Sequence, residues 1–352
     1  MALNKRLVFI FVLILISRID VISQKGIQFL NNKNFNQAIA LAKQQNKLLF
    51  VEAFTPDCHV CQSFKGTLAQ PQVGALYNAK FVNYQLDLRQ QSNYQILKQL
   101  KININATPTF LFFEPKTMKL VQARIFGERE NSVINVNSIG QKASNPSEFY
   151  DKMSERFKKG EKNQAFLLNY AEIARILGDT TVNIKVLNEY IKQIPQNQYL
   201  SQSSFNFLGK SLMNNNNPLF DYFINNIALY QKQFDPNAVR MTYENIFQIV
   251  LTSSQASKLG ASGIQKLKSQ MRKAGIEEGS ITRRTWMAET EMLFKAKKNK
   301  EALAVVQQVL NALPSAPGPK EYQFLCDYIR SKTKDPKTLQ FAKKNYCAFG
   351  MK

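Results

Sequence analysis

The stretch LLFVEAFTPDCHVC, from Leu48 to Cys61, decides the fold of this chain. Its first half, Leu48 to Phe54, is a dense apolar run that is short enough for a buried strand. Thr55-Pro56-Asp57 breaks the run, and two cysteines separated by two residues follow at once. Residues 58–69 then have the pattern of a helix, which we expect to stop near Pro71. The stretch predicts a buried strand, a turn and a helix that begins at a cysteine pair.

Strand and helix signals alternate on both sides of this stretch, from Gly26 to about Lys159. The predicted order is β-α-β-α-β-α-β-β-α, which indicates an α/β fold with a mixed sheet covered by helices on both faces. An Asn-rich insertion, residues 128–145, precedes the last helix. The expected strands are 27–30 at an edge, 48–54, 81–87, 109–113 and 120–126, and the expected helices lie around 35–42, 58–69, 92–100 and 147–157.

Beyond Lys158 to Lys162 the strand signals largely vanish and helical apolar periodicity continues. We therefore expect two domains, at residues 24–159 and 163–352, of which the second is all-α. Two of its helices resemble a tetratricopeptide pair, but no clean repeat period covers the rest, which favours irregular helical hairpins. The expected helices are 165–177, 182–194, 205–213, 220–230, 243–251, 286–297 and 300–313.

The cysteine pair has a specific chemical use at a strand-to-helix junction. The helix N-terminus stabilises a thiolate at Cys58, and Cys61 lies one turn on, within reach of its sulfur. Cys58 can then attack a substrate disulfide as the nucleophile, and Cys61 can resolve the mixed disulfide. A zinc site normally needs further ligands, and the single histidine of the chain is His59 itself. We predict no metal and no cofactor besides the redox-active Cys58–Cys61 disulfide, with a structural or redox-silent pair as the alternative.

Residues from about Gly26 to Phe157 resemble the thioredoxin superfamily, in particular its exported thioredoxin-like members. Three marks carry the resemblance together: the Cys58-His59-Val60-Cys61 motif after a buried strand, Glu52 upstream of it, and Ala106-Thr107-Pro108-Thr109-Phe110 at the start of a later strand. The resemblance covers less than half of the chain. It implies a thioredoxin fold and thiol-disulfide oxidoreductase activity for the first domain.

The resemblance also implies roles for three residues outside the cysteine pair. Pro108 is expected to be a cis-proline beside the active-site disulfide, and Thr107 to offer its backbone to a substrate chain. Glu52 is expected to be a buried carboxyl group that exchanges a proton with Cys61. The alternatives are an ordinary trans Thr-Pro bond and a strand carboxylate paired with a lysine.

The residues around Cys58 depart from the superfamily. Thioredoxins have Trp before the first cysteine and Gly-Pro between the two, where this chain has Asp57 and His59-Val60. Asp57 disfavours a thiolate at Cys58, whereas a protonated His59 favours it, so the sequence does not decide between a reductase and an oxidase. We place His59 with Thr107 and Pro108 at the substrate-binding surface, and the alternative is a plain loop residue.

The start of the chain is typical of an export signal. Lys5 and Arg6 precede an apolar run from Leu7 to Ile16, and Val21-Ile22-Ser23 forms a small-residue cleavage site. The run is about half the ~20 residues of a membrane-spanning helix. We therefore expect residues 1–23 to be removed and the protein to act in the periplasm, with secretion or an uncleaved membrane anchor as alternatives. No membrane contact is expected after cleavage.

Cys326 and Cys347 lie in the second domain, and export allows them to form a structural disulfide. The alternative is that Cys326, which follows Phe324 and Leu325, is a buried free thiol.

The net charge of +22 comes from 47 basic and 25 acidic residues spread along all 352 positions, without a nucleic-acid-binding motif. The expected partners are a client protein with a disulfide or thiol and a redox partner protein, and not nucleic acid. Two functions remain open: a thiol-disulfide oxidoreductase, or a redox-marginal adaptor or holdase whose helical domain binds a partner.

Overall fold

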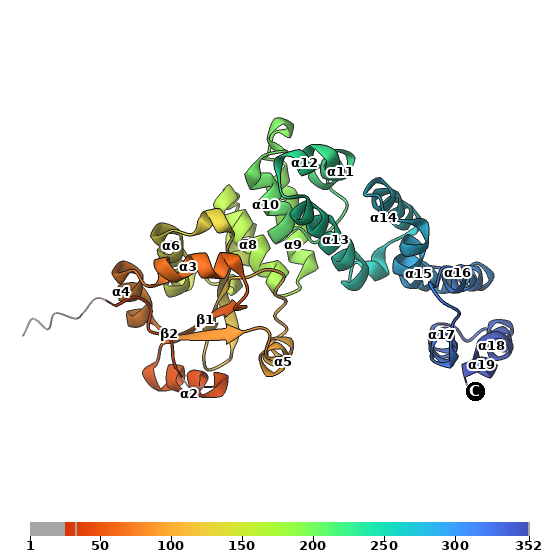
Figure 1. Ribbon diagram of the computed structural model, residues 1–352, viewed down its shortest axis with the longest axis horizontal. Coiled ribbons are helices and arrows are strands. Elements are labelled where there is room, and N and C mark those ends of the chain that lie inside the picture. The colour runs from red at the N-terminus through yellow and green to blue at the C-terminus, as the bar shows by residue number, and fades with distance from the viewer. Residues whose placement is uncertain (1–24, 32–33, 351–352) are drawn as a thin grey trace, which may run out of the picture. The chain divides into compact units, whose positions relative to one another are not determined.

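The computed structural model describes residues 25–31 and 34–350, so the predicted export signal lies outside the described residues. The chain divides into two compact units (Figure 1). The first comprises the described residues up to Leu100 together with Ile104–Glu155, and the second comprises Lys101–Asn103 together with the residues from Arg156 onward. Helix α7, Tyr150–Lys158, contains the boundary between them.

The first unit is built on one four-stranded mixed sheet in the order β2-β1-β3-β4. Strand β1 lies inside the sheet, parallel to β2 and antiparallel to β3, and β4 pairs antiparallel with β3. The strands are β1 Leu48–Phe54, β2 Phe81–Asp87, β3 Thr109–Glu114 and β4 Lys119–Ile125. The helices are α2 Phe35–Gln45, α3 His59–Leu68, α4 Pro71–Lys80, α5 Gln91–Gln99 and α6 Val133–Ser144, with short 3-10 turns at Glu128–Glu130 and Pro146–Glu148.

Helices cover the two faces of this sheet, and the alternation of side chains along each strand explains why. On one face, Phe50 of β1 packs with rings from β3 and with apolar residues of α3, α4 and α6. On the other face, α2 places Phe35 against Tyr84 of β2, with ring centroids 5.7 Å apart. Figure 1 shows α3, α4 and α6 on one side of the strands and α2 on the other. The mixed sheet between helices confirms the fold predicted for this region.

Three local predictions for the first unit were wrong. Ile27 to Leu30 is no strand, because only an isolated bridge joins Phe29 to Asn83. A second helix, α4, begins at Pro71, since proline lacks only an N–H that the first helical turn leaves unpaired in any case. The insertion at 128–145 contains α6, whose first turn Ser132 caps by accepting a hydrogen bond from the Asn135 N–H.

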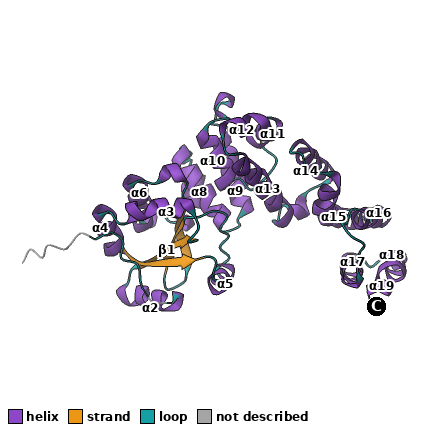
Figure 2. Ribbon diagram, viewed as in Figure 1, coloured by secondary structure: helices purple, strands orange, loops and turns teal. Residues whose placement is uncertain are grey.

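The second unit is helical throughout, which confirms the predicted all-α class; among the described residues, Figure 2 shows strands only in the first unit. The long segment predicted at 220–230 is two helices that meet at Asn226. The helices are α8 Gln164–Ile176, α9 Thr180–Ile191, α10 Gln202–Ser211, α11 Pro218–Asn225, α12 Ile227–Gln233, α13 Pro236–Thr252, α14 Ala261–Lys273, α15 Glu278–Lys295, α16 Asn299–Asn311, α17 Pro319–Lys332, α18 Pro336–Ala342 and α19 Ala348–Gly350, with a π-helical turn at Lys343–Cys347.

The last helices share a core around Trp286 and a disulfide between Cys326 and Cys347. Cys326 is 1% exposed and packs in the same cluster as Trp286, Tyr328 and Tyr346. The bond therefore ties α17 to the π-helical turn that follows α18. None of the helices in the described part of the chain has the length and apolar character that a membrane crossing requires.

We predict that this disulfide stabilises the C-terminal helices. Replacing both Cys326 and Cys347 by Ala should lower the free energy of unfolding of this region by about 3 kcal/mol, because the bond closes a loop over a separation of 21 residues. Trp286 is the only tryptophan, so its fluorescence during urea unfolding reports this core directly. The matched control replaces Cys58 and Cys61 by Ala and should leave the Trp286 transition in place. An unchanged transition in the Cys326/Cys347 variant would contradict the prediction.

Candidate active site

The cysteine pair lies at the junction of β1 and α3. After β1 ends at Phe54, the Cys58 N–H donates to the Thr55 carbonyl at 3.1 Å, which closes the turn. Cys58 is the N-cap of α3, and its Sγ accepts a hydrogen bond from the Cys61 N–H at 3.0 Å. The two cysteines form a disulfide in this structure. The first turn of α3 therefore directs a backbone N–H at the sulfur where a thiolate would carry its charge.

Thr107 and Pro108 come from a distant part of the chain to the same site. The bond between them is a cis peptide bond. The Thr107 carbonyl oxygen lies 3.4 Å from Cys58 Sγ, a contact that a thiol can use as a hydrogen bond and a disulfide cannot. The Pro108 carbonyl accepts from the Phe126 N–H at 3.0 Å, which joins this turn to the end of β4. Two segments of the sheet thus hold Thr107 against the redox sulfur.

The two sulfurs differ in their access to solvent. Cys61 is 5% exposed and belongs to the core, whereas Cys58 is partly exposed. Val60, between them, packs against the core of the first unit, and His59 points outward with a side chain that is 81% exposed. Of the two cysteines, Cys58 is therefore the one that is accessible from solvent.

Charged and titratable residues flank Cys58 in the chain. His59 Nδ1 lies 3.6 Å from Oε1 of Glu128, which is in the turn before α6, and both side chains are largely exposed. Asp57 is also exposed. Asp57 and His59 thus flank Cys58 in the chain, and Glu128 faces His59; of these groups only a protonated imidazole would favour a thiolate. Glu128 is a residue that the sequence analysis missed, because no motif or spacing connects position 128 with the cysteine pair.

Glu52 lies in β1 on the same face of the sheet as α3. Side chains two apart on a strand share a face, and Phe50 packs in the core that α3 covers. Cys61 and Lys65, one turn apart on α3, share a helix face, and the charge of Lys65 acts on Glu52. The Glu52 carboxyl group therefore lies under the helix that carries the cysteine pair.

Burial changes the titration of this carboxyl group. Glu52 is 2% exposed, and the loss of hydration raises its pKa from 4.5 to about 7, although a hydrogen bond from Gln85 and the charge of Lys65 lower it. Gln85 Nε2 donates to Glu52 Oε2 at 2.8 Å. A carboxyl group with this pKa can both give and take a proton near neutral pH.

Gln85 is the second residue that the sequence analysis missed. The register of the parallel strands pairs Leu48 with Phe81 and therefore Glu52 with Gln85. Both strands were expected with these same starting residues, so an assumed in-register parallel pairing would have placed Gln85 opposite Glu52.

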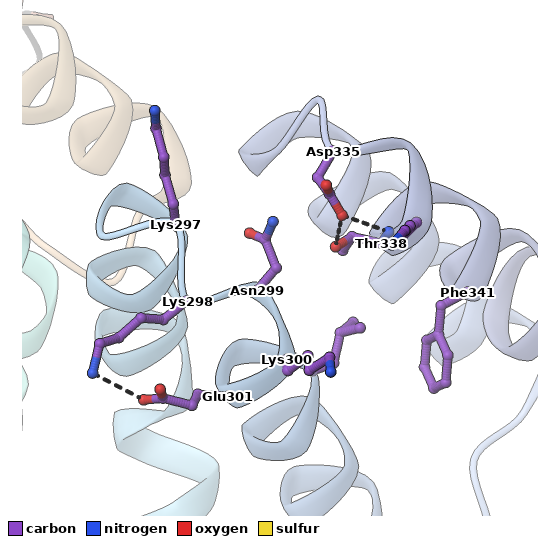
Figure 3. Close-up of a pocket in the computed structure, with 10 residues that line it drawn as sticks. Lys297, Lys298, Asn299, Lys300, Glu301, Asp335, Thr338 and Phe341 are labelled. Atoms are coloured by element: carbon purple, nitrogen blue, oxygen red, sulfur yellow. Dashed lines mark hydrogen bonds and ion pairs between the residues drawn. The ribbon is translucent and has the colours of Figure 1, made fainter.

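A pocket of about 520 Å³ opens in the second unit, around the start of α16 and α18 (Figure 3). Lysines line much of it, but Lys298 turns toward Glu301, 3.4 Å away, and Asp335 accepts hydrogen bonds from Thr338. None of the lining residues is a cysteine or a histidine, so the pocket adds no group to thiol chemistry. Within the described residues, no cluster of three or more His, Cys, Asp or Glu side chains is arranged to bind a metal ion.

The burial of Glu52 predicts that stability falls with rising pH. Between pH 4.5 and about 7 the unfolded chain loses this proton and the folded chain keeps it, so the free energy of unfolding decreases and then levels off. Glu52→Gln removes this loss. Relative to the parent, the variant should gain about 3 kcal/mol between pH 4.5 and 8.5, measured by urea unfolding of the oxidised protein followed by circular dichroism.

The matched control for this prediction is Glu277→Gln, at an exposed position of the second unit, which should follow the pH dependence of the parent. Parallel pH curves for the parent and Glu52→Gln would show that Glu52 does not titrate in this range.

The charges around Cys58 predict opposite effects on its reactivity. Asp57→Asn removes a negative charge beside the sulfur and should raise the rate of Cys58 alkylation at pH 6 about twofold. His59→Gln removes the imidazole and with it any positive charge beside Cys58, and should lower the rate by a similar factor. The reduced protein, treated with iodoacetamide and analysed by mass spectrometry of the peptide that contains Cys58, gives both rates. Equal rates in all three proteins would show that neither side chain affects the thiolate.

Part of this chain is similar to known proteins. Among solved structures, a thioredoxin from Thermus thermophilus is 22% identical, over 33% of this chain and 86% of that chain, with a TM-score of 0.29. A structure titled DsbH Oxidoreductase is 15% identical, over 34% of this chain and 87% of that chain, with a TM-score of 0.29. No curated protein matches. Residues 30–115 match the family model described as thioredoxin-like, so this match and the fold identify a thioredoxin-like region within the first unit.

Proposed function

We propose that this protein is a thiol-disulfide oxidoreductase that acts on protein disulfides outside the cytosol. The observation that carries the proposal is the cysteine pair itself: Cys58 caps α3, is bonded to Cys61 and faces the carbonyl of Thr107. A helix N-terminus favours the thiolate, partial exposure of Cys58 admits a substrate, and burial of Cys61 keeps the second thiol for the resolving step.

The proposed reaction begins with the reduced pair. The Cys58 thiolate attacks a sulfur of the client disulfide, forms a mixed disulfide and releases one client thiolate. Glu52 then takes the proton of the Cys61 thiol, and the Cys61 sulfur attacks Cys58, which releases the second client thiolate and leaves the Cys58–Cys61 disulfide. The client gains two electrons and the pair loses two. The same steps in reverse oxidise a client dithiol, so a redox partner protein that supplies or accepts two electrons completes either cycle.

The location outside the cytosol is supported by two features. The first residues have the charge, apolar run and small-residue site of an export signal. In addition, Cys326 and Cys347 are bonded in the second unit, and structural disulfides persist mainly in oxidising compartments. Periplasmic localisation is therefore part of the proposal.

A second candidate function is an adaptor or holdase, in which the helical unit binds a partner protein. One observation favours it: exposed apolar side chains gather on α15 and α17. Phe324 is 51% exposed and lies against Trp286 and Tyr328, while Met287 is 45% exposed and its carbonyl accepts from the Tyr328 hydroxyl. Exposed apolar groups that cluster in this way are typical of surfaces that bind proteins.

Insulin reduction by dithiothreitol distinguishes the two candidates. The full-length protein should accelerate it, and Cys58→Ser should reduce the catalysed rate to the background rate, because Cys61 is buried and Cys326 and Cys347 are bonded to each other. Cys61→Ser should accumulate mixed disulfides on Cys58 in cells, visible as adducts that dithiothreitol releases.

The control is the Cys326→Ala, Cys347→Ala variant, which should keep the insulin activity of the parent. Activity that survives Cys58→Ser would exclude the proposed chemistry. No activity in the parent, together with suppressed aggregation of an unfolded client by both the parent and Cys58→Ser, would favour the adaptor.

A further inference from the structure

Gln85 has no part in the reaction proposed above, yet it contacts a residue that does. Its side-chain amide donates to Glu52 Oε2 at 2.8 Å, across the parallel pairing of β1 and β2. The two residues differ sharply in burial, since Gln85 is exposed and Glu52 is 2% exposed. β2 is one of the two edge strands of the sheet, so the exposed Gln85 side chain can contact the buried Glu52 carboxyl group of β1.

The other groups that face Glu52 come from α3, α4 and β3. The charge of Lys65 on α3 favours the ionised form. Tyr77 on α4 also interacts with Glu52, and burial raises the pKa of its phenol well above the ordinary value, so the phenol stays neutral. The Tyr77 hydroxyl donates to the Val136 carbonyl at 2.8 Å, which already uses its proton. Phe110, the partner of Glu52 on β3, offers no polar group.

We propose that Gln85 is a positioning residue for the proton transfer between Glu52 and Cys61, and that its amide holds the carboxyl group of Glu52 in both protonation states. The NH₂ of the amide donates to the carboxylate, as seen here. After a half turn of the amide, its oxygen accepts from the protonated carboxyl group. A lysine at position 85 could only donate a hydrogen bond and would therefore hold only the carboxylate. A leucine at this position could hold neither the carboxylate nor the protonated carboxyl group. This inference rests on the proposed function, because it assigns Gln85 to the same redox cycle.

The contact matters because Glu52 must gain and lose a proton in every cycle. Burial alone would raise the pKa of Glu52 further, so that little of it would be ionised near neutral pH and able to accept the proton of the Cys61 thiol. The hydrogen bond from Gln85 acts against burial, and the resulting pKa of about 7 allows proton transfer in both directions near neutral pH. A neutral amide does so without a fixed charge, which would keep the carboxylate permanently ionised.

The test is the pH dependence of insulin reduction by the full-length protein between pH 5 and 9. Gln85→Leu removes the hydrogen bond, so the inflection that Glu52 gives to the rate should move up by about one pH unit. Gln85→Asn, whose side chain is too short to keep the contact, should move it in the same direction. Gln85→Lys supplies a cation and should move it down by about one pH unit.

The matched control is Gln95→Leu, the same chemical change at an exposed position of α5, and it should leave the inflection in place. Thermal unfolding of each variant separates a shifted profile from a lost fold. If the inflection stays at the pH of the parent in the Leu, Asn and Lys variants while Glu52→Gln abolishes it, Gln85 has no role in the proton step. An inflection that persists in Glu52→Gln removes the relay and this inference with it, whereas activity in Cys58→Ser removes the proposed function itself.

Discussion

The pairing of β1 with strands on both sides is the constraint on which the rest of the first unit depends. Because side chains alternate along a strand, a shift of one residue in this register would exchange the faces of every residue in β1. The observed register places Phe50 and Glu52 together toward α3, and pairs Glu52 with Gln85. It also fixes the end of β1, and so the position from which the chain turns into the cysteine pair. The register of β1 therefore determines both the composition of the aromatic core and the position of the cysteine pair.

Much of this arrangement was predictable from local sequence. The apolar run of β1, the break at Thr55-Pro56-Asp57 and the helix from the cysteine pair are all signals within one short stretch, and the structure has each of them. The two helices of the first unit that were missed, α4 and α6, lack such signals. In α4, apolar residues do not gather on one helix face, so periodicity could not reveal it. In α6 the many polar residues resemble a loop, although Val136, Ile139 and Ala143 reach the core.

The parts of the site that the sequence did not reveal depend on contacts between distant segments. Thr107 lies 49 positions from Cys58, Glu128 meets His59 across the turn before α6, and Gln85 is 33 positions from Glu52. The first of these was expected only through the resemblance to a known superfamily. Glu128 and Gln85 are ordinary polar residues, and their contacts with His59 and Glu52 can be recognised only in the folded protein. A motif such as the cysteine pair can be recognised in a sequence. The residues that adjust its reactivity come from distant segments, so they are identified only once the fold is known.

The two disulfides of the chain illustrate how position separates redox chemistry from architecture. Cys58 and Cys61 are separated by 3 positions, and Cys326 and Cys347 by 21. Since the stabilisation from a crosslink grows with the loop it closes, the first bond restrains the unfolded chain much less than the second. The two disulfides also differ in solvent exposure, since Cys58 is partly exposed and Cys326 is 1% exposed. The first bond is therefore the more accessible of the two and restrains the chain less, while the second lies within the core of the C-terminal helices.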